Sequence, residues 1–209
     1  MPGYVDKFGD AVRGVIRAYH GSPARNIRKF NPSKIGSARN GTALGYGFNF
    51  SEDPLFARQY RPMLGKTYEV EIGYPESSLI ALDERPTGDK RAALADMVYE
   101  APSNFWRDDA TQELMVGGNS QLVLESLLRA YNTEQMDRQK NLARIASELF
   151  DRQIPGARSD HYGPRTYVMY PGSEDQIRIL RKFALAPATL GAEGLVSQQQ
   201  EAGSKAPAF

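Results

Sequence analysis

The stretch "GYGFNFSEDPLFARQY", residues 45–60, gives the clearest indication of how this chain folds. It opens with two glycines one residue apart and continues as a short aromatic run, "YGFNF", at residues 46–50. Phe48 and Phe50 flank Asn49, so in a strand the two rings lie on the same face. The pattern predicts a short strand whose phenylalanines belong to the core.

The same stretch then changes abruptly into a helix-like run that ends in Tyr60. Pro54 suits the first turn of a helix, and either Ser51 or Asp53 is a suitable N-cap. A short way upstream, the run "AYHGSP" contains His20, one of the 2 histidines in the chain. The aromatic strand, its helix and this histidine are the features that a functional interpretation has to explain.

Other parts of the chain also have strand patterns. Runs bounded by glycine or proline predict strands at 15–23, 65–75, 165–170 and 176–183, and a buried strand or extended segment at 77–83. The run at 65–75 alternates two sets of side chains, Tyr68, Val70 and Ile72 against Thr67, Glu69 and Glu71. The polar set predicts that one face of this strand is wet.

Helical periodicity is found at 5–16, 89–100, 119–131 and 133–150. Residues 154–164, "IPGARSDHYGP", break the pattern before the last strands. Helices therefore cluster between strands and do not alternate with them, which disfavours a doubly wound nucleotide-binding fold. An α+β domain with a central, mostly antiparallel sheet is expected.

Composition sets the outer limits. The chain has 209 residues, 24% of them charged, a formal charge of +1 and no cysteine. This excludes disulfides and thiolate metal sites, and it gives no global field that favours nucleic acid or membrane. No apolar run approaches membrane-spanning length, so neither a membrane span nor a signal peptide is expected. We expect an N-terminal helix or arm at 1–16, one domain at 17–185 and a tail at 186–209.

Three pieces of sequence, in order, resemble the ADP-ribosyltransferase fold of diphtheria toxin and the poly(ADP-ribose) polymerases, and are most similar to such domains encoded by phages. The first is Tyr19-His20-Gly21-Ser22, similar to the family's His-Gly-Ser/Thr strand end. The second runs from Gly47 through Asp53 to Tyr60, similar to the family's Gly-x-Tyr-Phe-x-Asp strand and helix. The third is 165–170 with 176–180, similar to the closing strand pair. The resemblance covers roughly residues 17–183 and implies a split sheet with flanking helices.

The resemblance implies a site for NAD, which is the substrate of this family. His20 would contact ribose hydroxyls, the main chain of Gly21 would bind the nicotinamide carboxamide, and Tyr60 would stack on the nicotinamide ring. His20 and Tyr60 should then line one cleft. Ser22 and Ser51 would be polar groups at the rim of the site. Phe48 belongs to the second resembling stretch and is a candidate cofactor contact, and the alternative is that it packs in the core. Basic residues of the loop at 24–44 would meet the pyrophosphate: Arg25, Arg28, Lys34 and Arg39.

Two positions depart from the family pattern. Asn49 stands where the family has a stacking tyrosine, and Thr166 stands where it has a glutamate. These two are the candidate catalytic residues. The glutamate supports the positively charged transition state as the N-glycosidic bond breaks, and a hydroxyl cannot balance that charge. Asp160, Glu174 and Asp175 are the candidates to replace the missing carboxylate.

Several other residues have simpler interpretations. His161 is expected to be a loop or rim residue, because no partner stands at metal-ligand spacing. Trp106 is expected to anchor a small apolar cluster. The carboxylate pairs Glu69/Glu71 and Asp108/Asp109 are expected on exposed faces.

Two functions therefore remain open. The first is an NAD-binding ADP-ribosyltransferase-like phage protein that transfers ADP-ribose to a host macromolecule, either a protein or a nucleic-acid acceptor. The second is a catalytically degenerate structural or ejected virion protein that retains the fold and contacts phage particle components. The expected location is the bacterial host cytoplasm or the virion, without a membrane span. A general nucleic-acid binder has only the basic loop in its favour.

Overall fold

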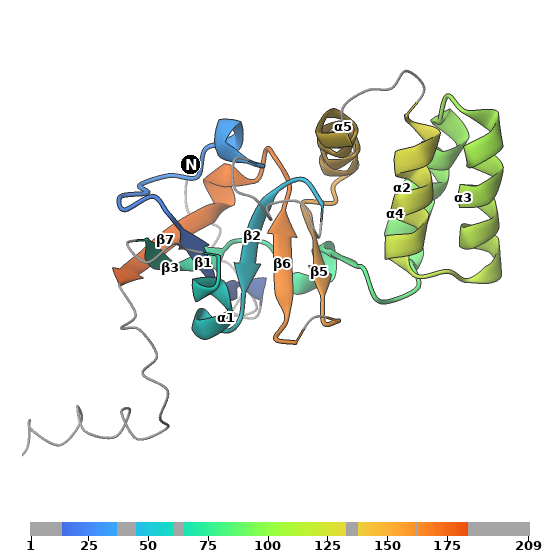
Figure 1. The fold of residues 1–209 in the computed structure, drawn as a ribbon. Coiled ribbons are helices and arrows are strands. Elements are labelled where there is room, and N and C mark those ends of the chain that lie inside the picture. Colours follow the sequence, from blue (N-terminus) through green and yellow to red (C-terminus); the bar gives the residue numbers. More distant parts are fainter. Residues whose placement is uncertain (1–13, 37–44, 61–64, 133–137, 162, 184–209) are drawn as a thin grey trace, which may run out of the picture.

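The computed structural model describes residues 14–36, 45–60, 65–132, 138–161 and 163–183. Figure 1 shows a sheet with the helices of residues 88–130 gathered at one end of it. The strands are β1 (Ile16–Ser22), β2 (Phe48–Ser51), β3 (Lys66–Ile72), β4 (Ile80–Ala81), β5 (Gly156–Ser159), β6 (Thr166–Met169) and β7 (Ile177–Phe183). The helices are α1 (Pro54–Arg58), α2 (Gly88–Glu100), α3 (Asn104–Val116), α4 (Ser120–Ala130) and α5 (Arg138–Asp151).

The strands form one 7-stranded sheet in the order β4-β5-β6-β2-β1-β3-β7. Every neighbouring pair is antiparallel except β4 and β5, which are parallel. The prediction of an α+β domain with a mostly antiparallel sheet is confirmed. The seam in the middle is narrow: β1 and β2 pair only at Tyr19 and Ser51, whereas β1 pairs with β3 from Ile16↔Ile72 to Ser22↔Lys66.

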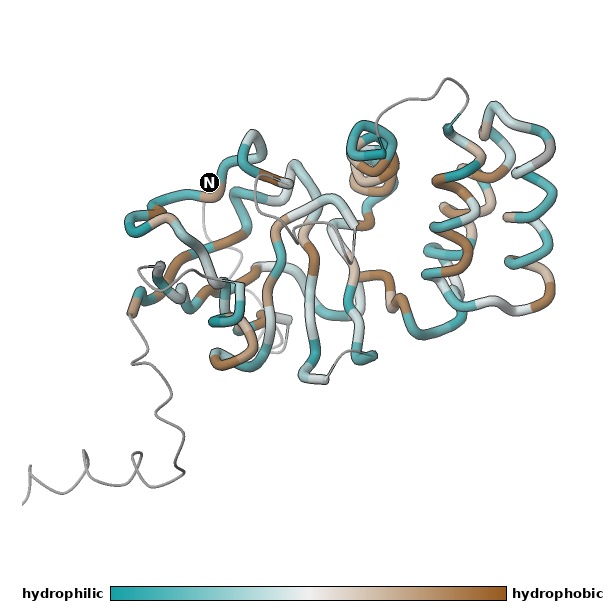
Figure 2. The backbone as a smooth tube through the Cα atoms, in the orientation of Figure 1, coloured by the Kyte–Doolittle hydropathy of each residue, from teal (hydrophilic) through white to brown (hydrophobic). Residues whose placement is uncertain are grey.

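Two hydrophobic cores stabilise the fold. One lies on the face of the sheet where the rings of Phe48, Phe50, Tyr68 and Tyr167 are buried, with Phe30 packed among them. The other joins α2, α3, α4 and α5 to the β4-β5-β6 end of the sheet. In Figure 2 the α5 tube is teal on its outer side and brown toward the sheet, as expected for an amphipathic helix.

The start of the aromatic stretch is explained by packing between strands. A Cβ on Gly47 would lie 2.4 Å from the carbonyl oxygen of Met169 in β6, so only glycine lets the two backbones approach this closely. Phe48 and Phe50 are buried, as predicted. Asp53 caps α1 by accepting a hydrogen bond from Leu55 N at 2.7 Å, and Pro54 occupies the first turn. Of the two predicted N-caps, Asp53 is the one used.

Three local predictions are wrong. Residues 103–116 were not predicted as a helix, yet they contain α3, which ends at Val116 and is followed by Gly117 with φ of 94°. The run 154–164 was predicted as a break, yet it contains β5. The predicted wet face of β3 is largely covered, since Thr67 and Glu69 are buried. The cause is that α1 packs against β3 and that Arg181 of β7 pairs with Glu69 at 2.6 Å.

The predicted helix at 5–16 and the tail at 186–209 fall almost wholly outside the described residues, and Ile16 begins β1. The predicted helix at 133–150 is found from Arg138 onward within the described part. Among the described residues, no helix combines the length and the apolar character needed to cross a membrane.

Candidate functional site

The first two stretches that carry the family resemblance, and residues 165–170 of the third, lie in neighbouring strands, whereas 176–180 leads into β7 at the far edge of the sheet and does not pair with β6 as expected. β6, β2 and β1 are adjacent in the sheet, although they come from distant parts of the sequence. Tyr19 pairs with Ser51, and Ser51 pairs with Thr166, so one row of residues crosses all three strands. Residues paired in this way point to the same face. The structure therefore brings together the predicted residues Ser51 and Thr166, with Asn49 two positions away on the same face.

Gly21 fixes the position of α1 on this face. A Cβ at Gly21 would lie 1.8 Å from the carbonyl oxygen of Ala57, which is far inside any real contact distance. The backbone of β1 therefore lies directly beneath α1. Beyond Tyr19, β1 has no ladder partner in β2, so the main chain at Gly21 and Ser22 faces β2 without strand pairing on that side.

The polar side chains on the α1 side already have local hydrogen bonds. The Thr166 hydroxyl is buried and donates to the carbonyl of Ser159 at 3.2 Å. The Ser51 hydroxyl accepts from Asp53 N at 3.1 Å. Asn49 donates through Nδ2 to the carbonyl of Gly47 at 3.3 Å. These bonds hold the strand ends in place, and a ligand would have to add to them or replace them.

His20 points to the other face of the sheet. Its ring packs against Phe30, Phe50 and Tyr68, with centroid distances of 5.1, 5.6 and 6.5 Å. Its Nδ1 lies 2.8 Å from the carbonyl oxygen of Asn49, and because a carbonyl can only accept, Nδ1 carries the proton. His20 thus bridges β1 and β2 where their ladder stops. Burial lowers the pKa of the His20 imidazole, and the hydrogen bond to Asn49 opposes that shift.

Tyr60 lies beyond the end of α1 and is 46% exposed. Its ring packs edge-on against Phe56 at a centroid distance of 5.7 Å. Since His20 points away from the face that carries α1, the structure does not bring the His20 and Tyr60 rings together in the expected way. Ser22 and Phe48 are both buried. Ser22 accepts a hydrogen bond from Ala24 N, and Phe48 packs against Phe30.

The candidate carboxylates are engaged elsewhere. Asp160 pairs with Arg165 at 2.7 Å, and the hydrogen bond from Arg165 lowers the pKa of Asp160. Asp175 pairs with Lys29 at 2.7 Å, and Glu174 accepts a hydrogen bond from Gly172 N. Asp160 is the one that lies near Thr166, because it follows Ser159, the strand partner of Thr166, but its carboxylate is held by Arg165.

The remaining predicted residues are placed as follows. Arg25, Arg28 and Lys34 are exposed, and Arg39 lies outside the described residues. His161 is an exposed turn residue. Trp106 packs against the helical core and lies beneath the guanidinium of Arg129 at 5.3 Å, in agreement with its predicted anchoring role.

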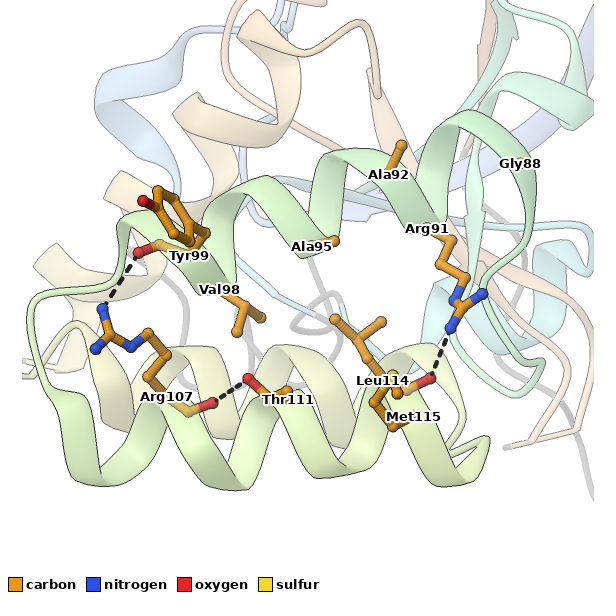
Figure 3. A pocket seen from close by; sticks show the side chains of 10 residues that line it. All are labelled: Gly88, Arg91, Ala92, Ala95, Val98, Tyr99, Arg107, Thr111, Leu114 and Met115. Carbon is orange, nitrogen blue, oxygen red and sulfur yellow. Dashed lines mark hydrogen bonds between the residues drawn. The ribbon is translucent and has the colours of Figure 1, made fainter.

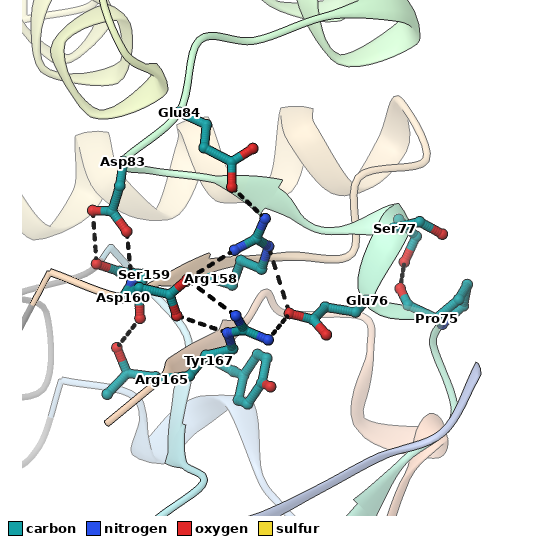
Figure 4. Close-up of polar contacts among 12 residues, drawn as sticks. Pro75, Glu76, Ser77, Asp83, Glu84, Arg158, Ser159, Asp160, Arg165 and Tyr167 are labelled. Atoms are coloured by element: carbon teal, nitrogen blue, oxygen red, sulfur yellow. Dashed lines mark hydrogen bonds and ion pairs between the residues drawn. The ribbon is translucent and has the colours of Figure 1, made fainter. Parts of the chain in front are cut away.

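A polar network where β5 ends and β6 begins was not predicted. Arg165 pairs with Glu76 at 2.7 Å, and Arg158 pairs with Glu84 at 2.6 Å. Figure 4 shows Arg158 and Arg165 among these carboxylates. Nearby, the Tyr167 hydroxyl donates a hydrogen bond to Glu52 at 2.6 Å. Burial, followed by the Glu52 hydrogen bond, raises the pKa of Tyr167. The partners are too far apart in sequence for any local pattern to pair them.

A groove between α2 and α3 was not predicted either. Its volume is about 1040 Å³, and Figure 3 shows Arg91 and Arg107 near its two ends. Arg91 donates to the Leu114 carbonyl and Arg107 to the Tyr99 carbonyl, both at 3.4 Å, so each arginine ties the two helices together. Among the described residues, no cluster of three or more histidine, aspartate or glutamate side chains is arranged to hold a metal ion.

The position of His20 predicts how stability depends on pH. The unfolded chain binds a proton at His20 near the ordinary pKa of about 6.5, whereas the folded chain resists it. The contribution of neutral His20 to the free energy of unfolding should therefore be fully present above pH 6.5 and be lost as the pH decreases below it. Urea unfolding at several pH values measures this loss, and His20→Gln should reduce its steepness. His161→Gln is the matched control, and an equal reduction there would contradict the assignment.

Comparisons with known proteins identify no family for this chain. No protein-family model matches it, and no curated protein matches it. A solved structure titled "Crystal structure of an anti-CRISPR protein" is similar over 82% of this chain and 100% of that chain, with 12% identity and a TM-score of 0.38. A similarity of this size supports no conclusion about fold family or function.

Proposed function

We propose that this chain is an ADP-ribosyltransferase-like, phage-encoded protein that binds NAD on the α1 side of the β1-β2-β6 junction. The observation that carries the proposal is the convergence of the three resembling stretches: Tyr19, Ser51 and Thr166 form one row across adjacent strands. The proposal places the protein in the bacterial host cytoplasm or in the virion, with a host protein or nucleic acid as acceptor.

The main chain after Tyr19 would supply the carboxamide contacts. Peptide N–H and C=O groups bind an amide well when they are not already used in a ladder. β1 loses its ladder partner in β2 beyond Tyr19, so the edge of its main chain that faces β2 is not used in strand pairing there. His20 would act in this site by holding β1 to β2 through Asn49.

Tyr60 would stack on the nicotinamide ring. Its side chain is 46% exposed and has an aromatic neighbour in Phe56, so one ring face can be covered by a ligand. Stacking contributes about 0.5–1.5 kcal/mol beyond burial, which corresponds to roughly a two- to tenfold change in affinity. Tyr60→Ala should weaken NAD binding by at least this factor.

Calorimetric titration with NAD measures this effect. Tyr99→Ala is the matched control, because Tyr99 is 81% exposed on α2 and belongs to a different surface. Unchanged affinity in Tyr60→Ala, or an equal loss in both variants, would contradict the stacking role. Absence of NAD binding by the unmodified protein would overturn the proposed function itself.

A second candidate function is a catalytically degenerate virion protein that keeps the fold. Thr166 favours it, because the hydroxyl is buried and bonded to Ser159, and because the family's carboxylate is missing at this position. The ion pairs of Asp160 and Asp175 favour it as well. Release of nicotinamide from NAD separates the two functions: turnover supports an enzyme, and NAD binding without turnover supports the degenerate protein.

A further inference from the structure

Positive charge is concentrated at the β7 end of the sheet. We call residues 14–36, 65–75 and 171–183, which contain β1, β3 and β7, the β7 end. It holds nine lysines and arginines against four acids, a net charge of +5, whereas the whole chain carries +1. The remainder of the chain is therefore acidic overall, and the charge is strongly asymmetric.

Most of the acids at the β7 end are already paired. Glu69 pairs with Arg181 and Glu71 pairs with Arg178, both at 2.6 Å. Lys29 pairs with Asp175 at 2.7 Å. Among the described residues, Arg17, Arg25, Arg28 and Lys66 have no carboxylate within ion-pair distance. Of these cations, Arg17 lies on the same face of the sheet as Tyr19, whereas Lys66 pairs with Ser22 and points to the other face.

Aromatic rings lie among the cations on one face of this end. Tyr19 of β1 and Phe183 of β7 are both partly exposed, and their rings meet edge-on at a centroid distance of 6.3 Å. Strand register places Arg17, Tyr19, Arg178, Arg181 and Phe183 on the same face. The side chain of Arg178 is 69% exposed, and that of Arg181 is 74% exposed.

The two faces of this end differ in how they are covered. On the opposite face, residues of the loop after β1 seal the strands: Phe30 is buried against Phe48 and Phe50. The Tyr19 face has α1 at one end, above Gly21. Figure 1 shows β7 as the outermost strand, at the end of the sheet farthest from the α2-α3-α4 helices.

We infer that the Tyr19–Phe183 face of β1, β3 and β7 is a binding surface for single-stranded nucleic acid. Guanidinium groups bind phosphates through paired hydrogen bonds, and aromatic rings on a sheet accept the unpaired bases of a single strand by stacking. A duplex hides its base faces, so it could use only the cations. This inference does not depend on NAD binding.

The competing explanation is that the charges protect an exposed edge strand from pairing with other chains. That role needs charge but no aromatic rings and no anionic ligand. It predicts that removal of the charges changes self-association and leaves nucleic-acid binding absent. The two explanations are therefore separated by variants of the rings.

Fluorescence anisotropy with labelled mixed-sequence single-stranded RNA and DNA oligonucleotides tests the inference on the full chain. Tyr19→Leu and Phe183→Leu keep apolar bulk and remove the flat ring. Each should weaken binding by about five- to a hundredfold, the range found for loss of one stacked base. Circular dichroism confirms that the variants are folded.

The cations are tested with a charge-matched pair of double variants. Arg17→Gln with Arg178→Gln, both on the Tyr19 face, should weaken binding and reduce the salt slope of log affinity by about 1.4, because two phosphate contacts are lost. Arg138→Gln with Lys140→Gln removes the same charge from exposed positions on α5 and should have little effect.

Four outcomes would overturn the inference. They are absence of binding at low salt, duplex bound as tightly as single strands, ring variants that bind normally, and equal effects of the two double variants. Self-association of Arg17→Gln with Arg178→Gln, without any loss of nucleic-acid binding, would identify the charges as edge protection.

Discussion

Replacing Gly21 with alanine should lower the free energy of unfolding, because the added methyl group meets the backbone of α1. The new Cβ would lie 1.8 Å from the carbonyl oxygen of Ala57 and 2.9 Å from its carbon, so the clash is with backbone and not with a flexible side chain. Relief requires α1 to move away from β1. Overpacking of this kind typically costs about 1–3 kcal/mol, and occasionally more. Denaturant unfolding of Gly21→Ala measures the loss.

Gly14→Ala is the control for this experiment. Its Cβ would meet Pro75 at 3.4 Å, an ordinary contact, so its free energy of unfolding should change little. The two variants add the same methyl group and differ in the space available. Equal stability of Gly21→Ala and the unmodified protein would show that α1 does not lie directly on β1, and the proposed NAD site would then not be bounded by α1.

Leu127→Ala should lower the free energy of unfolding by about 2–5 kcal/mol, the range for truncating a fully buried leucine. Leu127 is 0% exposed and belongs to the core that joins α2, α3, α4 and α5 to β5 and β6 through Ala157 and Val168. Because helices and sheet share this core, the variant should still unfold in a single transition. Circular dichroism and tyrosine fluorescence should report the same midpoint.

Leu122→Ala, in the same helix, is the matched control. Leu122 is 43% exposed, so its truncation should cost much less than that of Leu127. Two separate transitions in Leu127→Ala, with the helical signal lost first, would contradict a shared core. The helices would then form a unit of their own, and the prediction of one domain at 17–185 would need revision.

The parts of the fold that could be predicted are those encoded in local patterns. Phe48 and Phe50 alternate with Asn49, and they are buried in β2. Asp53 and Pro54 start a helix because a capping side chain and a fixed φ act within two residues. The strand runs at 15–23, 165–170 and 176–183 correspond to β1, β6 and β7.

The parts that could not be predicted depend on contacts between distant residues. Glu69 has an ordinary acidic position in an alternating strand, and its burial follows from Arg181 on another strand. The sequence around β5 contains proline and glycine and so does not look like a strand. β5 forms because it pairs with β6. α3 had a usable signal in Ala110, Leu114 and the terminal Gly117, but its charged middle obscured that signal.

The candidate site shows the same division. The sequence indicated which stretches would meet, and the structure places β1, β2 and β6 side by side. The sequence could not indicate on which face of the sheet each of these side chains would lie. Whether His20 shares a face with α1 depends on which residue of β1 lies under Ala57, and that residue is Gly21.

The strand order has a consequence for how the protein emerges from the ribosome. β2 pairs with β6 and β3 pairs with β7, and the whole helical segment is synthesised between the partners. β1 and β3 can pair early, but β2 and β3 each keep an unsatisfied edge until the last strands have been made. Pairings of such long sequence separation form slowly. The nascent chain must therefore remain partly folded, with open strand edges, until β6 and β7 have been synthesised.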